Sequence, residues 1–469
     1  SSSRTRNVTS FPSCNGTPGA GATRHLSPSN ERLSYFSVFR IMMSTKYSWL
    51  LLLPAFVGCQ DERATKPQAP ALRATVAEAK RSGVVVDVPI EAYQRDLLQL
   101  AFDAASKFPS VPHTKNRGRA QDLVITACFE LEQPLLAAAL APKVEGWRRG
   151  VAYADFAWCC AKVHDVDGAQ RYIGLAESVL EEQRGDATAQ DWRADKVRIK
   201  IARALRTLGE QQKSDAVLQS VSASSAGAVD RSWTGTMASH LEAMTAAVAA
   251  SELERITDTF PSQSLGEQYT SMMLVSGMHG RFFDETTLRA ITEERLFVRF
   301  EKLPTNLRLD AMAPLVAHYV EHRDFDGARN VIHTMTQLMA KFSWRPEERM
   351  PQLARIAELR DAVGDRERAK QELQEAFKYY NDNREQIVNI YRCESLRPLA
   401  LAWHKLGDAE QADDLVALCL EEALENPNSR PRCDDFVETC IAMARHQQKP
   451  STALWQRMHE ITVGLSTPW

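Results

Sequence analysis

Cysteine is the residue of this 469-residue chain with the widest range of possible chemistry, and nine are present. No two of them have the C-x-x-C spacing of a structural zinc site. Setting aside Cys14 and Cys59 leaves seven, an odd number that argues against a complete disulfide framework. We interpret the remaining cysteines as packing residues, including the neighbours Cys159 and Cys160, which point to different sides of a helix.

Two cysteines lie in similar sequence contexts and are the pair to test first for a disulfide. Arg392-Cys393-Glu394 and Arg432-Cys433-Asp434 are 40 residues apart. Equivalent positions of neighbouring repeats lie near one another in space, so an oxidising compartment could link Cys393 to Cys433. Cys440, seven residues after Cys433, could share its helix face but is interpreted as a core residue.

Motifs that would carry catalysis or bind a metal are incomplete. His459-Glu460-Ile461-Thr462-Val463 begins like a zinc-protease helix, but Val463 stands where the second His is required. Acidic pairs such as Glu181-Glu182 and Asp413-Asp414 are interpreted as helix surface, because glycoside hydrolysis needs two carboxyls across a cleft. No G-x-S-x-G nucleophile motif is present. The sequence therefore predicts no catalytic residue, no metal and no cofactor.

Recurring tryptophans with neighbouring arginines are the remaining binding candidates. Trp147, Trp192 and Trp233 are 45 and 41 residues apart, and they could form an aromatic row for a ligand or fill the core between repeats. Arg148, Arg149 and Arg193 stand beside them. These arginines could line a groove for an acidic partner, or be solvated, or pair with Glu of a neighbouring repeat.

The segment around Cys59 has the layout of an export signal. Lys46 precedes a short apolar run, Trp49–Val57, which ends at Gly58-Cys59. The run is too short to span a bilayer, which needs about 20 residues. With Cys directly after Gly, the segment resembles a bacterial lipoprotein signal, although Phe56 stands where Leu is usual. The resemblance implies a lipid on Cys59 and anchoring in the cell envelope; an ordinary signal peptide is the alternative.

Composition and charge exclude some classes of protein. The chain is 44% hydrophobic and 25% charged, which excludes wholesale disorder, and its formal net charge is −3. Cleavage before Cys59 would remove six basic residues and one acidic residue, leaving 51 basic and 59 acidic residues, a net of −8. Without a basic excess, a nucleic-acid partner is not expected.

The chain after the signal contains a repeated turn between two helical segments. Gly364-Asp365-Arg366-Glu367-Arg368-Ala369 and Gly407-Asp408-Ala409-Glu410-Gln411-Ala412 share the pattern G-D-x-x-x-A. Related turns begin at His164 and Arg323, and Gln448–Ala453 is a decayed copy. The alanines at 328, 369, 412 and 453 are 41, 43 and 41 residues apart, which indicates a period near 41.

Each turn is expected to join two amphipathic helices. Gly407 ends the first helix, Asp408 caps the second, and the small Ala412 allows the two helices to approach closely. Neither helix can bury its apolar stripe alone, so successive pairs must stack. The predicted fold class is therefore all-α, an α-solenoid of stacked antiparallel helix pairs.

The G-D-x-x-x-A turn resembles that of the tetratricopeptide (TPR) family over about residues 145–465, although that family's period is 34. The resemblance implies a binding surface for a protein or peptide and no catalysis. The expected organisation by residue range is 1–41 without a folded role or an over-extended start, 42–58 signal peptide, 59–89 flexible tether, 90–146 a helix pair (Ile90–Lys107 and Arg117–Leu140), and 147–469 the TPR-like array.

Two functions from different classes remain open. The first is an envelope-anchored scaffold, facing away from the cytoplasm, that binds a protein or peptide and is held to the membrane by its lipid. The alternative is a secreted enzyme that acts on polysaccharide, because paired helices of this number can also close into an α/α toroid. The short and similar connections favour the scaffold.

Overall fold

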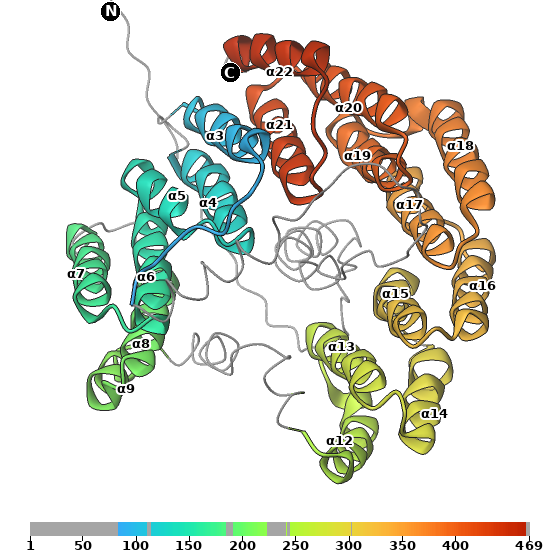
Figure 1. Cartoon of the computed structure of the whole chain (residues 1–469), viewed down its shortest axis with the longest axis horizontal. Coiled ribbons are helices and arrows are strands. Elements are labelled where there is room, and N and C mark those ends of the chain that lie inside the picture. Colours follow the sequence, from blue (N-terminus) through green and yellow to red (C-terminus); the bar gives the residue numbers. More distant parts are fainter. Residues whose placement is uncertain are drawn as a thin grey trace, which may run out of the picture. The chain divides into compact units, whose positions relative to one another are not determined.

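The computed structural model describes residues 83–109, 114–183, 191–222, 241, 244–301 and 303–465, all within one compact unit, Phe56–Trp469. Within these residues all regular structure is helical, which confirms the predicted all-α class (Figure 1). The predicted signal, Cys59, Cys14, Trp233 and most of the predicted tether lie outside the described residues.

Eighteen α-helices are described. The helices before residue 220 are α3 (Ala92–Ser106), α4 (Thr114–Glu130), α5 (Pro134–Leu140), α6 (Trp147–Lys162), α7 (Val166–Glu182), α8 (Asp191–Thr207) and α9 (Gln211–Gln219). Those after residue 244 are α12 (Ala246–Thr259), α13 (Leu265–Arg281), α14 (Thr286–Glu294), α15 (Thr305–Glu321), α16 (Phe325–Lys341), α17 (Pro346–Ala362), α18 (Arg366–Asn383), α19 (Asn389–Lys405), α20 (Ala409–Leu424), α21 (Ser429–Arg445) and α22 (Thr452–Gly464). Short helical turns are η1 (Ala141–Lys143), η3 (Phe260–Ser262), η4 (Arg295–Arg299) and η5 (Arg384–Gln386).

The predicted turn recurs as one hydrogen-bonded geometry. At Gly407 the backbone takes φ +79°. The Asp408 amide donates a hydrogen bond to the Trp403 carbonyl at 3.1 Å, which closes a turn of six residues. This is the Schellman ending of a helix, which requires one left-handed residue. Asp408 Oδ1 then accepts from the Gln411 amide at 3.1 Å and caps α20. The same left-handed step occurs at Glu132, His164, Gly209, Arg323, Gly364 and Gln447.

Small residues follow these turns where the second helix meets the first. Ala169, Ala328, Ala369 and Ala412 are fully buried. The expectation for Ala453 is wrong, because this residue is exposed and Leu454 is buried in its place. The left-handed residue there is Gln447, and α22 begins five residues later at Thr452, whereas α20 begins two residues after Gly407, because Pro450 and Ser451 lengthen the connection.

A second recurring feature fixes the start of each first helix. The fourth residue of several of these helices donates a side-chain hydrogen bond to a carbonyl of the loop before it. Arg308 Nη2 reaches the Phe297 carbonyl at 3.0 Å, and Arg392 Nε reaches the Ile387 carbonyl at 3.1 Å. The other donors are Arg117 (to Phe108), Gln268 (to Phe260) and Arg432 (to Asn426). These bonds attach the start of each first helix to the segment before it.

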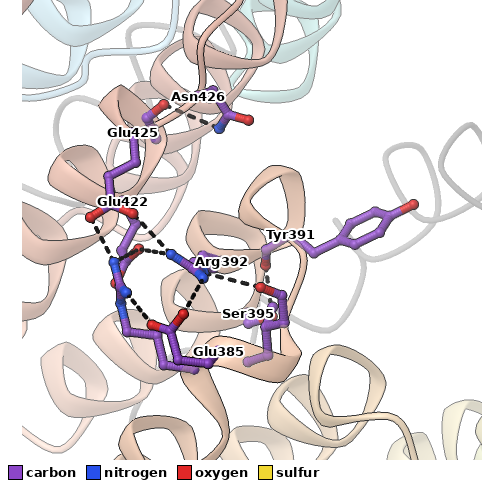
Figure 2. Close-up of polar contacts among 10 residues, drawn as sticks. Glu385, Tyr391, Arg392, Ser395, Glu422, Glu425 and Asn426 are labelled. Carbon is purple, nitrogen blue, oxygen red and sulfur yellow. Dashed lines mark hydrogen bonds and ion pairs between the residues drawn. The ribbon is translucent and has the colours of Figure 1, made fainter.

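Around Arg392 this contact extends into an ion network that joins three elements (Figure 2). Arg392 Nη1 lies 2.9 Å from Glu425 and 3.6 Å from Glu422. Arg384 binds the buried Glu422 with two hydrogen bonds, of 2.6 and 2.9 Å. The network holds η5, α19 and α20 together at the edge where successive pairs meet. Because the arginines and glutamates of this network are charged and partly buried, the network fixes the relative positions of these elements more than it adds stability.

The helices pack in neighbouring pairs, and the first helices of successive pairs also contact one another: α13 with α15, α15 with α17, α17 with α19, and α6 with α8. This packing is consistent with a helical solenoid. At the N-terminus, the expected helix 117–140 is split into α4 and α5, because Glu132 takes the left-handed conformation between them.

The contact that sequence order does not predict is the packing of α3 against α21 (Figure 1). Gln94 Nε2 donates to the Ala444 carbonyl at 2.7 Å, and Tyr93 donates to the Gln447 carbonyl at 2.8 Å. Arg445 of α21 pairs with Glu130 of α4. One hydrophobic core consequently contains residues of α3–α8 together with residues of α17–α22. The N-terminal helices thus continue the stack beyond the C-terminal ones.

Candidate functional site

One side of α6 and α8 gathers cationic and aromatic side chains. On α6, Arg148, Asp155, Trp158 and Lys162 are seven, three and four residues apart, a spacing that places them on one side of a helix. Tyr153 and Phe156 instead contact Tyr172 of α7, so the stripe lies away from α7.

Helix α8 presents a matching stripe at spacings of four, four and three residues. We define the α6–α8 basic surface by six cations, three tryptophans and two carboxylates: Arg148, Lys162, Arg193, Lys196, Lys200, Arg203, Trp147, Trp158, Trp192, Asp122 and Asp155. Asp122 is contributed by α4.

Two tryptophans form the aromatic part at one end of this surface. The rings of Trp147 and Trp192 meet edge to face, with centroids 5.4 Å apart. Trp147 is 8% exposed and belongs to the core, whereas Trp192 is 40% exposed. The Lys196 ammonium lies 5.5 Å from the Trp147 ring centroid and 5.2 Å from that of Trp192. A cation at this distance is attracted by the ring faces, which holds it beside an exposed apolar surface.

Trp158 is placed between two cations at the other end. The Lys162 ammonium lies 3.8 Å and the Arg203 guanidinium 3.9 Å from its ring centroid. Arg203 also binds Asp155 at 2.6 Å, and Lys200 binds the same carboxylate at 2.7 and 2.9 Å. One aspartate therefore balances two cations here.

Asp122 is the second carboxylate, and its Oδ2 lies 3.4 Å from Arg148 Nε. Burial raises the pKa of Asp122 to about 6, although the positive charges of Arg148, Lys200 and Lys196 oppose the rise; Asp155 adds to it. Burial likewise lowers the pKa of Lys196, with the like charges of Arg148 and Lys200 adding to the effect and Asp122 opposing it.

The pKa of Arg148 is also lowered, first by burial and then by the charges of Arg119 and Arg193, against the opposing charge of Asp122. The common first cause of these shifts is burial, and for Lys196 and Arg148 the neighbouring positive charges add to it. An additional negative charge at this surface would relieve the repulsion among these positive charges. The arrangement therefore suits the binding of an anion beside an aromatic ring.

Of the arginines predicted from sequence, the structure brings two to this surface and places the third elsewhere. Arg148 and Arg193 both belong to it, and the Arg193 guanidinium lies 5.6 Å from the Trp192 ring centroid. Arg149 turns toward α7 and pairs with Glu182. Glu182, interpreted from the sequence as helix surface, therefore forms an ion pair with Arg149. Trp233 lies outside the described residues.

Sequence reasoning missed Lys196, Lys200 and Arg203, together with both aspartates. A signal was present, because residues 192, 196, 200 and 203 have helical spacing with no acidic residue among them. Asp413, interpreted as surface charge, has a structural role: its Oδ2 accepts the Ser451 amide at 2.6 Å. His459 contacts the Trp455 ring on α22.

A second polar cluster, buried between α13, α14 and α15, was also missed. His279 Nε2 lies 3.1 Å from Glu293 Oε1, His279 Nδ1 lies 3.2 Å from His318 Nδ1, and Tyr319 donates to Glu293. Burial lowers the pKa of His318 to about 3, so its ring is neutral at physiological pH. With its hydrogen bonds satisfied internally, this cluster is a packing network within the core of α13–α15.

The part of the chain that the structure describes contains no group of three or more His, Cys, Asp or Glu side chains placed to bind a metal ion. None of the described helices is long and apolar enough to cross a membrane. Comparison with protein-family models and with curated proteins finds no match to this chain.

The raised pKa of Asp122 predicts a pH-dependent difference between wild type and Asp122→Asn. The pKa is about 6 in the folded chain against an ordinary value of 3.8. The folded state therefore binds this proton more tightly, and the resulting stability is present in full below about pH 4 and lost as the pH rises through about 6. We expect the unfolding free energy of wild type to fall relative to that of Asp122→Asn over this range.

Urea unfolding followed by circular dichroism at a series of pH values measures this difference. Asp122→Asn is the control for wild type, because the two proteins share all other titrating groups, whose contributions cancel in the difference between their unfolding free energies. A wild-type stability that rises relative to Asp122→Asn with pH would mean that the ion pair with Arg148 outweighs burial, and it would contradict the assignment.

Proposed function

We propose that this chain is a helical-repeat scaffold, TPR-like in type with units of about 41 residues, that binds an acidic segment of a protein partner. The observation that carries the proposal is the α6–α8 basic surface, in which six cations face two carboxylates beside an exposed tryptophan. Carboxylates of the partner would pair with Lys196 and Arg193, and an apolar side chain would lie on Trp192.

Charge favours a protein segment over a nucleic acid. The whole chain has a net charge of −3, so a polyanion with one charge on every nucleotide would be repelled outside this limited surface. A peptide with a few acidic residues matches the excess of four cations and leaves Asp122 and Asp155 in place. It also supplies apolar side chains for the tryptophans.

The proposed location of the protein is the bacterial cell envelope. The support is the sequence from Lys46 to Cys59, which resembles a lipoprotein signal. A lipid on Cys59 would hold the mature chain at a membrane, and residues 60–82 would separate the helical array from its surface. Scaffold and anchor are separable proposals, because the first rests on α6 and α8 and the second on the signal.

Charge reversal on the basic surface tests the binding proposal. We expect a fluorescein-labelled Glu-rich peptide to bind the purified chain, and Lys196→Glu to raise its Kd by about tenfold or more, which corresponds to about 1.4 kcal/mol. Fluorescence anisotropy measures this change. Affinity should also fall as the salt concentration rises, because charges at a partly exposed surface are screened.

Two controls accompany this measurement. Lys378→Glu on α18 reverses a lysine whose side chain is 76% exposed and should leave the Kd unchanged. A peptide with Gln in place of Glu should bind weakly. Equal binding of the Gln peptide would overturn the proposal, and tighter binding of an oligonucleotide of equal charge would favour a nucleic-acid ligand instead. Crosslinking in envelope fractions, with wild type and Lys196→Glu side by side, would then identify the partner.

Metabolic labelling with a fatty-acid analogue tests the anchor. Wild type should be labelled and recovered with membranes, whereas Cys59→Ser should lose the label and move to the soluble fraction, since one cysteine carries the acyl group. Cys128→Ser, which changes a buried thiol in α4, is the control and should keep the label. Membrane recovery of unlabelled Cys59→Ser would contradict a lipid anchor.

A polysaccharide-degrading enzyme is the second candidate, and one observation favours it. Asp122 has a pKa of about 6, which is suited to a general acid, and it lies in the cluster that contains Asp155 and the Trp147–Trp192 pair. Tryptophan faces also stack on sugars. Release of sugars from a polysaccharide panel by wild type, but not by Asp122→Asn, would replace the scaffold proposal with this one.

A further inference from the structure

Ion pairs join successive helices of one row, and we call them the ion-pair ladder. They connect α15 to α17, α17 to α19, α19 to α21, α21 to α4, α4 to α6 and α6 to α8, and the helices of each connection are in contact. In that order the partners are Asp310–Arg355, Glu358–Lys405, Arg397–Glu438, Asp434–Arg119, Asp122–Arg148 and Asp155–Lys200. The ladder thus crosses the contact between C-terminal and N-terminal helices and ends at the α6–α8 basic surface.

The pair between Asp122 and Arg148 is the longest of the ladder. Its Oδ2 to Nε distance is 3.4 Å. The other pairs, in ladder order, have nitrogen–oxygen distances of 2.5, 2.6, 2.9, 2.7 and 2.7 Å. Charge-assisted hydrogen bonds favour about 2.7–2.9 Å. Asp122 therefore holds its cation less firmly than any other carboxylate of the ladder.

Arg148 also lies at the aromatic end of the basic surface. Its guanidinium carbon is 4.5 Å from the Trp147 ring centroid, and this ring contacts the exposed Trp192. A partner whose apolar side chain lies on Trp192 would bring a neighbouring carboxylate toward Arg148. Lys200 and Arg203 are less available, because Asp155 binds both of them at distances of 2.6 to 2.9 Å.

The charges around Asp122 make its own negative charge costly to keep. Burial raises the pKa of Asp122 to about 6; Arg148 of α6 and Lys200 and Lys196 of α8 oppose the rise, and Asp155 of α6 adds to it. The other helices packed on α4 present few charges: α5 has no charged residue, Arg95 of α3 binds Asp87, and Asp434 of α21 is bound by Arg119. A partner carboxylate that bound Arg148 would offset a charge that keeps Asp122 ionised, so partner binding and protonation of Asp122 favour each other.

We propose that Arg148 is shared between Asp122 and the acidic partner: Asp122 binds it in the free protein, and a partner carboxylate binds it in the complex. Asp122 is then an internal competitor that limits the affinity of the α6–α8 basic surface. It favours partners that place a carboxylate at Arg148 beside an apolar side chain on Trp192. This inference rests on the proposed function, because it concerns the same surface.

Removal of the competitor tests the inference. We expect Asp122→Asn to lower the Kd of the fluorescein-labelled Glu-rich peptide by about three- to fivefold at pH 7.5 and constant salt, measured by fluorescence anisotropy. The control is Asp326→Asn on α16, which changes the net charge equally at a side chain that is 93% exposed. It should leave the Kd unchanged. Circular dichroism checks that the variants fold.

The gain in affinity should depend on Arg148. In an Arg148→Gln background, Asp122→Asn should change the Kd by less than about twofold, because the shared cation is absent. An equal gain in both backgrounds would mean that Asp122 acts only through its charge at a distance, and it would overturn the sharing of Arg148.

The pH dependence of binding is a second readout. The Kd of wild type divided by that of Asp122→Asn should fall toward one between pH 7.5 and 5.5, because Asp122 becomes protonated through about pH 6 and stops competing. The titration of the peptide cancels in this ratio. Calorimetry of wild type at pH 6.5, in two buffers with different heats of ionisation, needs no variant and should show proton uptake on binding.

The outcomes separate this inference from the proposed function. If wild type and Asp122→Asn bind the peptide with the same Kd, or if wild type takes up no proton, the inference is wrong and the proposed function stands. If neither protein binds the peptide, both are wrong.

Discussion

The packing of α3 against α21 is the contact on which the rest of the molecule depends. A helix of such a stack leaves an apolar side uncovered at the end of the array, and α21 would have such a side without a further layer. Helix α3 packs against α21 as that layer, and its Leu97, Leu98 and Phe102 are fully buried. Burial of each such side chain contributes about 1.5–3 kcal/mol.

This contact also positions the candidate binding surface. Because α3 follows α21, helix α4 reaches α21 as well, where Arg119 binds Asp434 at 2.7 Å. Helix α4 in turn packs on α6, and α6 on α8, so Asp122 is brought beside Arg148 and Lys196. A surface whose cations come from residues 148–203 is thus held in place by a core that extends to residue 465.

The helices and turns could be predicted from local sequence signals, whereas the long-range contacts could not. Gly407 and Gly364 indicate left-handed turns in the sequence. His164 and Arg323 adopt the same conformation without glycine, and their turns could be predicted only from the aspartate that follows each. Trp192 and Arg193 could be proposed as binding residues because aromatic and cationic side chains recur together. Asp122 could not, since it joins them from another helix. The pairing of Glu130 with Arg445 spans 315 residues, and no periodicity connects such positions.

If the N-terminal helices complete the C-terminal ones, a double-mutant cycle on Glu130 and Arg445 will show that the two sets of helices are energetically coupled. Native-state hydrogen exchange measures the opening free energies of α4 and α21 in wild type, Glu130→Ala, Arg445→Ala and the double variant. We expect a coupling energy of about 0.5–3 kcal/mol in both helices, because each single variant leaves a partly buried charge without its partner. Additive effects, or an effect confined to the helix that carries the substitution, would contradict it.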